Sequence, residues 1–280
     1  MLANKDYLDL PKHFWAHVKF LSGVLGYSER GTNKLKTYTK DEIIEAMKKK
    51  GLDTSHLSEK LNDGRDYADT LVGYLNYRSR VIEKDVESNL MTREEAKKIF
   101  DDLVTKLKPK CKLPMNKQKG DKRHNAYLTG IVNMLTEKAL GNCNFEDDPQ
   151  TLTVATFNKR PLRTFTRRFD GVYPDSANPV ALWEIKEYYG TTTFGSRVAD
   201  GIYETMLDGK ELLELKESEN MHIKHYLMVD DRFTWWKLGK SYICRIVDML
   251  HEEYLDEVLF GKEVVSRWPD IVKSWGDVTK

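Results

Sequence analysis

Two acidic residues and one lysine in the second half of the chain have a spacing that could bring them together. Asp170 ends the strand-like run RTFTRRFDGVY, and Glu184 and Lys186 lie two residues apart in the run PVALWEIKEYY. Side chains alternate along a strand, so Glu184 and Lys186 should project from one face. The segment PDSANP between the two runs is rich in turn-forming residues, which predicts a hairpin with Asp170 beside Glu184.

Two carboxylates and an ammonium group on one face of a sheet suit a particular chemistry. Carboxylates bind hard cations such as Mg²⁺, which keeps part of its water shell in protein sites. Such a cation activates a bound water and stabilises the charge that develops during phosphodiester hydrolysis. A lysine next to a metal-binding Glu can orient or deprotonate the attacking water if burial lowers its pKa. The residue types therefore predict Asp170, Glu184 and Lys186 as catalytic residues.

The competing interpretation is that Glu184 and Lys186 form a solvated pair, as most Glu and Lys residues two apart on a strand do. The rest of this strand is apolar and aromatic, which is typical of a central strand. Charged groups on a buried strand need partners or a function, because burying an unpaired charge is costly. The basic residues just before Asp170 also favour a functional site.

The elements that must position these residues alternate between helix and strand. The sequence predicts helices over 124–140, 196–215 and 242–259, and strands within 151–157, 163–173, 179–189 and 225–231. This order predicts an α/β fold with a mixed central sheet flanked by helices.

The first part of the chain is predicted to be helical. Capping boxes at Thr39–Glu42 and Thr92–Glu95 open two helices, with a longer helix over 67–87 between them. Such helices fit either a helix-turn-helix or winged-helix region, or a plain helical bundle. The segment PKCKLPMNKQKGDKR is the best linker candidate, so we expect a helical domain over 1–115 and a second domain over 116–280.

Basic residues are clustered although the net charge is only +1. Residues 106–123 carry eight basic side chains against one acidic side chain, and residues 159–168 carry five basic side chains and no acidic one. Solvated loops would explain either cluster alone, but both precede the catalytic candidates, which favours a phosphate-binding surface. The DNA-contacting residues predicted from these patterns are Lys117, Lys119, Lys122, Arg163, Arg167, Arg168 and Arg197, with Arg78 and Arg80 as candidates to read bases.

The succession of FDGV, about ten residues and WEIK resembles the PD-(D/E)XK nuclease superfamily, type II restriction endonucleases in particular, over roughly residues 120–260. The resemblance implies that Asp170 and Glu184 bind Mg²⁺ with the backbone carbonyl of Ile185, and that Lys186 is the catalytic lysine. The fold that it implies is a restriction-endonuclease-like core. Phe169 stands where the family name has proline, a position that the family holds loosely.

Many members of that superfamily also use a Glu on the helix before the first catalytic strand. Glu137 has that place in the sequence, but its position on the helix is opposite the apolar stripe, so we expect it to face solvent. Asn125 and Tyr127 flank the stripe and are alternative contributors to the site.

Length and composition exclude several classes of protein. The chain has 280 residues, of which 40% are hydrophobic and 32% charged, which suits one large or two modest globular domains. No window approaches the roughly 18 apolar residues of a membrane span, and the N-terminus has no apolar signal-peptide core. The three cysteines lie far apart without a CxxC pair, which argues against a disulfide framework or a structural zinc site. These features predict a cytoplasmic protein.

The leading interpretation is a Mg²⁺-dependent endonuclease that cuts double-stranded DNA at a specific sequence. A structure-specific repair or junction nuclease, a non-catalytic nucleic-acid-binding protein and a nuclease that acts on RNA stay open as alternatives. One active site per chain and two antiparallel strands to cut favour a twofold homodimer. A restriction enzyme would also imply a partner DNA methyltransferase, which nothing in this sequence identifies.

Overall fold

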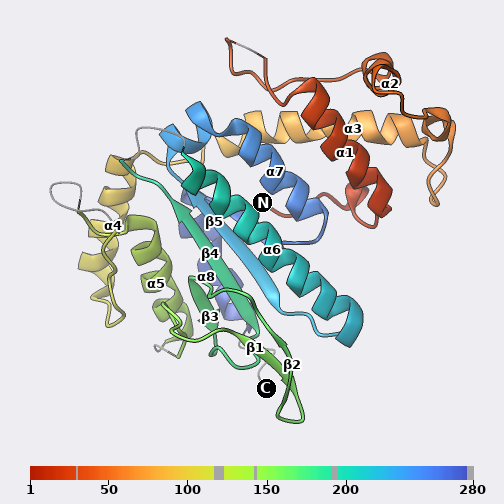
Figure 1. Ribbon diagram of the computed structural model, residues 1–280. Helices are drawn as coiled ribbons and strands as arrows, with labels where there is room; N and C mark the ends of the chain where they lie inside the picture. Colours follow the sequence, from red (N-terminus) through yellow and green to blue (C-terminus); the bar gives the residue numbers. More distant parts are fainter. Residues whose placement is uncertain (30, 117–122, 142–143, 191–194, 276–280) are drawn as a thin grey trace.

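A four-stranded sheet with helices on both faces forms the centre of the molecule (Figure 1). The computed structural model describes residues 1–29, 31–116, 123–141, 144–190 and 195–275. Its helices are α1 (Lys12–Leu25), α2 (Lys40–Lys49), α3 (Tyr67–Val81), α4 (Arg93–Leu107), α5 (Tyr127–Leu140), α6 (Ser196–Glu219), α7 (Lys240–His251) and α8 (Lys262–Trp275). Its strands are β1 (Val154–Phe157), β2 (Arg160–Thr164), β3 (Gly171–Tyr173), β4 (Ala181–Glu187), β5 (Lys224–Asp230) and β6 (Glu257–Phe260).

The central sheet has the strand order β3-β4-β5-β6. β3 runs antiparallel to β4, whereas β4, β5 and β6 run parallel to one another. Parallel neighbours need a crossover connection, and α6 and α7 supply it between β4 and β5 and between β5 and β6. A mixed sheet flanked by helices, after a helical N-terminal part, confirms the predicted fold class.

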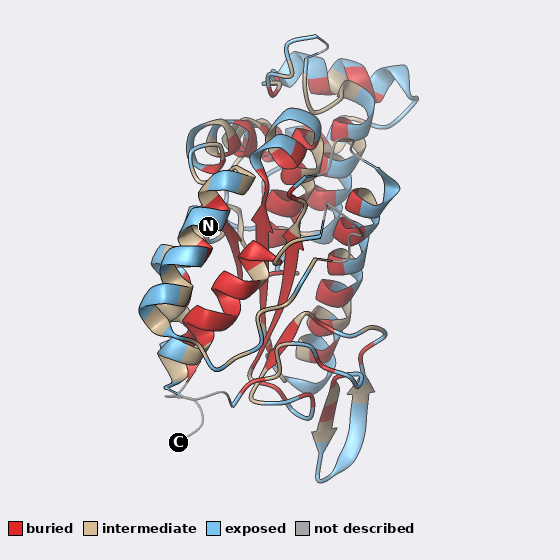
Figure 2. Ribbon diagram, turned by 90° about the vertical axis from the view of Figure 1, so that its left-hand side faces the viewer, coloured by how far each residue is buried: buried red, intermediate tan, exposed pale blue. Residues whose placement is uncertain are grey.

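Two layers of helices cover the two faces of the sheet (Figure 2). α5 and α8 pack on the face that presents Trp183 and Ile185 of β4. α6 and α7 pack on the opposite face, which presents Leu227 and Val229 of β5. All residues from Ala181 to Lys186 are buried, so β4 is a central strand, as its apolar sequence predicted. Among the described helices, none has the length and hydropathy that crossing a bilayer requires.

The N-terminal helices α1, α2 and α3 enclose a small core of their own. α3 also contacts α7, where the guanidinium of Arg78 donates to both carboxylate oxygens of Asp248, at 2.9 and 2.8 Å. Arg78 is only 1% exposed. The prediction that Arg78 faces DNA is therefore wrong for this structure, because the side chain is a buried partner of Asp248. Arg80 is exposed, and its role stays a prediction.

α4 belongs with the sheet rather than with the N-terminal helices. Met91, Ala96 and Phe100 join the apolar cluster that contains α5 and α8. Gly130 of α5 permits this approach, because a Cβ there would lie 2.4 Å from the ring of Phe100. Ile82, Val86 and Leu90 also pack with β5 and α7 and not with the N-terminal core. By packing, the chain therefore divides near the end of α3, and not near Asn116 as the lysine-rich segment suggested.

The structure corrects the predicted secondary structure in two places. The run 163–173, expected as one strand, contains the end of β2 and all of β3, which lie in different sheets. In the run 242–259, which was expected to be one helix, α7 ends at His251, and Glu253 has a left-handed φ of 61°. Residues Glu257–Phe260 are buried and pair in parallel with β5. This pairing outweighs the helical periodicity of the sequence.

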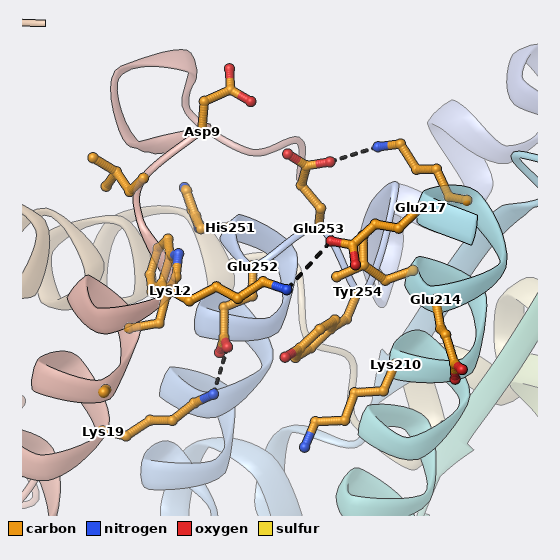
Figure 3. A pocket seen from close by; sticks show the side chains of 15 residues that line it. Asp9, Lys12, Lys19, Lys210, Glu214, Glu217, His251, Glu252, Glu253 and Tyr254 are labelled. Atoms are coloured by element: carbon orange, nitrogen blue, oxygen red, sulfur yellow. Dashed lines mark hydrogen bonds and ion pairs between the residues drawn. The ribbon is translucent and has the colours of Figure 1, made fainter. Parts of the chain in front are cut away.

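A cavity of about 610 Å³ lies where α1 meets α6 and the segment after α7 (Figure 3). Its charged residues pair across the gap, as Lys12–Glu217, Lys19–Glu252 and Lys216–Glu253. None of the predicted catalytic residues lines this cavity, so it does not mark the candidate site.

Candidate active site

The β3–β4 hairpin holds Asp170 against β4. The Oδ2 atom of Asp170 accepts a hydrogen bond of 2.8 Å from the backbone N–H of Ile185. Gly171 is opposite Trp183 in the register, and a Cβ at Gly171 would lie 2.1 Å from the Trp183 ring. The glycine after Asp170 is therefore required for the two strands to pair so closely.

Glu184 and Lys186 project from the same face of β4, as their spacing predicted, and face α6. Glu184 is fully buried and Lys186 is 7% exposed. The ammonium Nζ of Lys186 lies 2.6 Å from Oε2 of Glu184. Gly201 of α6 lies directly over this lysine, since a Cβ on Gly201 would be 3.4 Å from Cδ of Lys186.

The charges of this pair decide its protonation. Burial alone would lower the pKa of Lys186, but the carboxylates of Glu184 and Asp170 outweigh burial, and the pKa is raised. Burial alone would raise the pKa of Glu184, but Lys186 and Arg167 outweigh it, and the pKa is lowered. The condition for Lys186 to act as a base, a pKa lowered by burial, is not met without metal, because Glu184 and Asp170 outweigh the effect of burial.

Asp170 is partly exposed and carries a perturbed carboxyl group. Burial and then the charge of Glu184 raise its pKa to about 6, against the opposing effect of Lys186. A cation bound between the two carboxylates would remove the main charge that opposes ionisation of Asp170.

Arg167 points into the site instead of toward solvent. Its Nη1 atom lies 3.0 Å from Oε1 of Glu184 and 2.6 Å from Oδ2 of Asp208, and its Nη2 atom lies 3.3 Å from Glu204. In this structure Arg167 is therefore the counter-ion of buried carboxylates. Its predicted role as a phosphate contact on the DNA surface is not compatible with this position.

Two acidic residues of α6 belong to the site although the sequence analysis did not select them. Glu204 and Asp208 share a helix face with Gly201 because they follow it by three and seven residues. Asp208 is fully buried, and burial and then the charge of Glu184 raise its pKa to about 7. The Oδ1 atom of Asp208 and the Oε1 atom of Glu184 accept no hydrogen bond from any described residue. The spacing Gly-x-x-Glu-x-x-x-Asp is the sequence feature from which these two residues could have been predicted to share one helix face.

The donors at the hairpin fit Mg²⁺ chemically. Asp170 and Glu184 offer carboxylate oxygens, and Ile185 offers a carbonyl on the same strand, which are the hard ligands that Mg²⁺ prefers. The Oε1 atom of Glu184 is in an ion pair with Arg167 but accepts no well-formed hydrogen bond, so it is available to a cation that displaces Arg167. The described part of the chain holds no group of three or more His, Cys, Asp or Glu residues arranged to hold a metal. A site of two carboxylates, with water completing the coordination, is consistent with that arrangement.

The other candidates on α5 have local roles. The carboxylate of Glu137 accepts hydrogen bonds from the backbone N–H groups of Lys110 and Cys111, so it orders the segment after α4. The ring of Tyr127 stacks on His124. Glu187, at the end of β4, accepts from Leu128 and Thr129 at the start of α5 and so caps that helix.

The remaining basic candidates are spread over the surface. Arg163 is paired with Glu214 at 2.7 Å, whereas Arg168 and Arg197 are exposed. Lys117, Lys119 and Lys122 lie outside the described residues. The second basic cluster is therefore divided, with part of it serving the acidic site and part of it at the surface.

Two family models match the chain. One, described as Domain of unknown function (DUF7687), matches residues 91–275, and the other, described as Domain of unknown function (DUF7690), matches residues 1–85. The two matches meet between residues 85 and 91, a few residues after the end of α3, where packing divides the chain. No curated protein and no solved structure gives a significant match.

Proposed function

We propose that this chain, which belongs to the family of the domain of unknown function DUF7687, is a Mg²⁺-dependent endonuclease that hydrolyses phosphodiester bonds of double-stranded DNA. The proposal keeps the catalytic residues that the sequence predicted, Asp170, Glu184 and Lys186. It also keeps the resemblance to the PD-(D/E)XK nucleases, and the cytoplasm as the compartment.

The observation that carries the proposal is an excess of negative charge at a buried hairpin. Four carboxylates share two cationic side chains, Arg167 and Lys186; the carboxylates are the buried Glu184 and Asp208, the partly exposed Asp170 and the exposed Glu204. Buried carboxylates are costly unless a proton or a cation neutralises them. A divalent cation would supply this charge, and phosphodiester hydrolysis needs one at the same place.

Each residue of the hairpin has a role in this account. Asp170, Glu184 and the carbonyl of Ile185 would hold Mg²⁺, which when bound activates water and neutralises charge on the scissile phosphate. Without metal, Lys186 is held protonated because Glu184 and Asp170 raise its pKa. In that state it would donate hydrogen bonds that orient the attacking water or the phosphate.

Duplex DNA is the favoured substrate because exposed basic residues border the site. Arg168 follows Arg167 directly, and Arg197 opens the helix that carries Glu204. Such side chains neutralise phosphates without reading sequence. Sequence-specific cutting and a twofold homodimer, which presents two active sites to two strands, remain parts of the proposal.

Incubation with plasmid and phage DNA, followed by sequencing of the ends, tests this function. We expect cleavage with Mg²⁺ or Mn²⁺, no cleavage with EDTA, and discrete ends if the enzyme is sequence-specific. Ends at branched substrates alone would favour the repair nuclease. Cleavage of RNA without cleavage of DNA would contradict the proposal, as would DNA cleavage that persists in EDTA. Glu184→Gln, purified in parallel, controls for contaminating nucleases, and Glu217→Gln, which changes an exposed residue on α6, controls for the purification itself.

A further inference from the structure

β1 and β2 form a two-stranded ribbon that extends away from the central sheet (Figures 1 and 2). Its base is fixed to the body of the protein, since Ala155 and Phe165 are fully buried. Thr156 and Asn178 add two hydrogen bonds at the base, of 2.6 and 2.9 Å. The ribbon is therefore anchored at one end and exposed at the other.

The exposed end carries apolar and basic side chains together. Phe157 is 65% exposed, the highest value among the large hydrophobic side chains of the described residues, and Leu162 is 40% exposed. Asn158 and Lys159 make the turn, with left-handed φ values of 50° and 65°, which is typical of a tight two-residue hairpin turn. An exposed Phe at the tip of an ordered turn contributes nothing to the core, so its apolar surface is available to a binding partner.

The charge of the ribbon indicates the partner. Residues 154–164 contain three basic side chains and no acidic one. Arg163 is paired with Glu214 on α6, whereas Lys159 and Arg160 are exposed at the tip and form no ion pair with any described residue. Two free cations beside an exposed aromatic ring match a polyanion that also has apolar surface, which describes nucleic acid.

A protein partner fits the ribbon less well. The usual way for a protein to bind an exposed strand is to add a strand of its own through backbone hydrogen bonds. Pro161 lies in the middle of β2 and has no N–H to donate, so it blocks such pairing along this strand.

The ribbon is directly connected to the candidate active site. Arg160 and Arg167 are seven positions apart in the sequence, which limits the distance between their Cα atoms to roughly 25 Å. Duplex DNA rises about 3.4 Å per base pair, so the tip would reach bases within one turn of the helix from a phosphate at the site. A two-stranded ribbon also matches the width of the major groove.

We propose that the β1–β2 ribbon enters the major groove of duplex DNA beside the cleavage site, with Phe157 against the bases and Lys159 and Arg160 on the phosphates. This inference rests on the proposed function and identifies a contact that the active site does not require. It assigns the apolar tip to recognition and the two cations to affinity.

Fluorescence anisotropy with a labelled DNA duplex, in Ca²⁺ to limit cleavage and at several salt concentrations, tests the inference. Lys159→Ala with Arg160→Ala should reduce the slope of log affinity against log salt by about 2. Phe157→Ala should weaken binding on the order of tenfold without changing that slope, since an apolar contact with base edges involves no charge. Phe157→Leu, which keeps an apolar tip, should recover part of the affinity.

Matched controls separate the ribbon from general surface effects. Leu52→Ala removes another exposed apolar side chain, and Lys48→Ala with Lys50→Ala removes two exposed lysines of the N-terminal bundle; all should bind as the unchanged protein does. Unchanged affinity and slope in both ribbon variants would overturn the inference, as would a loss for duplex RNA alone. If the unchanged protein binds and cuts DNA while the ribbon variants behave like it, only this inference fails. If the unchanged protein binds no DNA, the proposed function fails first.

Discussion

Two clusters of charged side chains in this protein differ in their ratio of cationic to anionic groups. At the junction of α3 and α7, Nη1 of Arg78 donates to both carboxylate oxygens of Asp248. The Tyr74 hydroxyl donates to Asp248 at 2.7 Å, and the Ser22 hydroxyl accepts from Arg78 at 3.1 Å. One cation meets one anion there. At the β3–β4 hairpin four carboxylates share Arg167 and Lys186, and two carboxylate oxygens are left without a hydrogen bond.

This difference distinguishes a structural ion pair from a cluster whose excess negative charge a cation would neutralise. The charges of Arg78 and Asp248 balance, although Nε of Arg78 has no hydrogen-bond partner among the described residues. This pair connects α3 to α7. An unbalanced cluster keeps its carboxylates at a cost, which shows in the raised pKa values of Asp170 and Asp208. Burial alone would not have distinguished the two clusters; the count of charges and partners does.

The largest expected effect is on the stability of the junction. Asp248→Asn leaves the buried guanidinium of Arg78 without its anion, so we expect a loss of about 3–5 kcal/mol in the free energy of unfolding. The matched change Asp208→Asn at the hairpin should cost less than about 1 kcal/mol at pH 5, where Asp208 is protonated, because Arg167 keeps Glu184 and Glu204 as partners. Urea denaturation of both variants measures this contrast, and equal losses would remove the distinction between the clusters.

The next prediction concerns Arg167 as a competitor of the metal. Arg167→Gln removes a positive charge 3.0 Å from Glu184, so we expect Mn²⁺ to bind on the order of tenfold more tightly without DNA. Glu184→Gln should weaken the same binding. Titration calorimetry measures both, with Arg163→Gln as a control that removes an arginine paired away from the hairpin. Weaker binding by Arg167→Gln would mean that Arg167 builds the site and does not compete for it.

The pH dependence of stability gives a third comparison. Asp208 has its pKa raised to about 7 by burial and by Glu184, so the folded protein retains a proton that the unfolded chain releases. Stability from this group is present below pH 4 and is lost as the pH rises toward 7. Asp208→Asn should remove this decline. At pH 8 and without metal, its free energy of unfolding should exceed that of the unchanged protein by on the order of 2 kcal/mol. Identical pH profiles of melting temperature for the two proteins would count against the excess of negative charge.

The smallest expected effect is at Gly201. A Cβ there would lie 2.9 Å from the Tyr188 hydroxyl, which must shift, and in van der Waals contact with Cδ of Lys186 at 3.4 Å. Gly201→Ala should therefore displace the Tyr188 hydroxyl and restrict the position of Lys186 beside it. We expect a several-fold fall in kcat with little change in melting temperature. Gly23→Ala has open space around its Cβ and serves as the control. An unchanged kcat would show that the exact position of Lys186 is not important.

Local sequence patterns predicted much of this molecule. The capping boxes at Thr39 and Thr92 are confirmed with both of their reciprocal hydrogen bonds, and strand alternation placed Glu184 and Lys186 on one face of a buried strand. These successes depend on residues close together in the sequence. The hairpin also followed from its turn residues, which hold Asp170 beside β4.

Contacts between distant segments were not predictable in the same way. Arg78 looked like a surface residue of a helix, and only the packing of α7 on α3 brings Asp248 to it. Asp208 lies 24 residues beyond Glu184 on a helix whose orientation the sequence does not fix, so its part in the site was missed. β6 was missed because its pairing with β5 is a tertiary interaction.

The central claim is that Lys186 acts in a Mg²⁺-dependent cut made at the Asp170–Glu184 hairpin. The most direct measurement is the single-turnover cleavage rate of Lys186→Ala on a DNA that the unchanged protein cuts, with DNA affinity measured alongside. We expect a rate at least about 100-fold lower, with affinity nearly unchanged, because the lysine acts on the reacting groups and not on docking. Cleavage by Lys186→Ala at nearly the original rate would contradict the account.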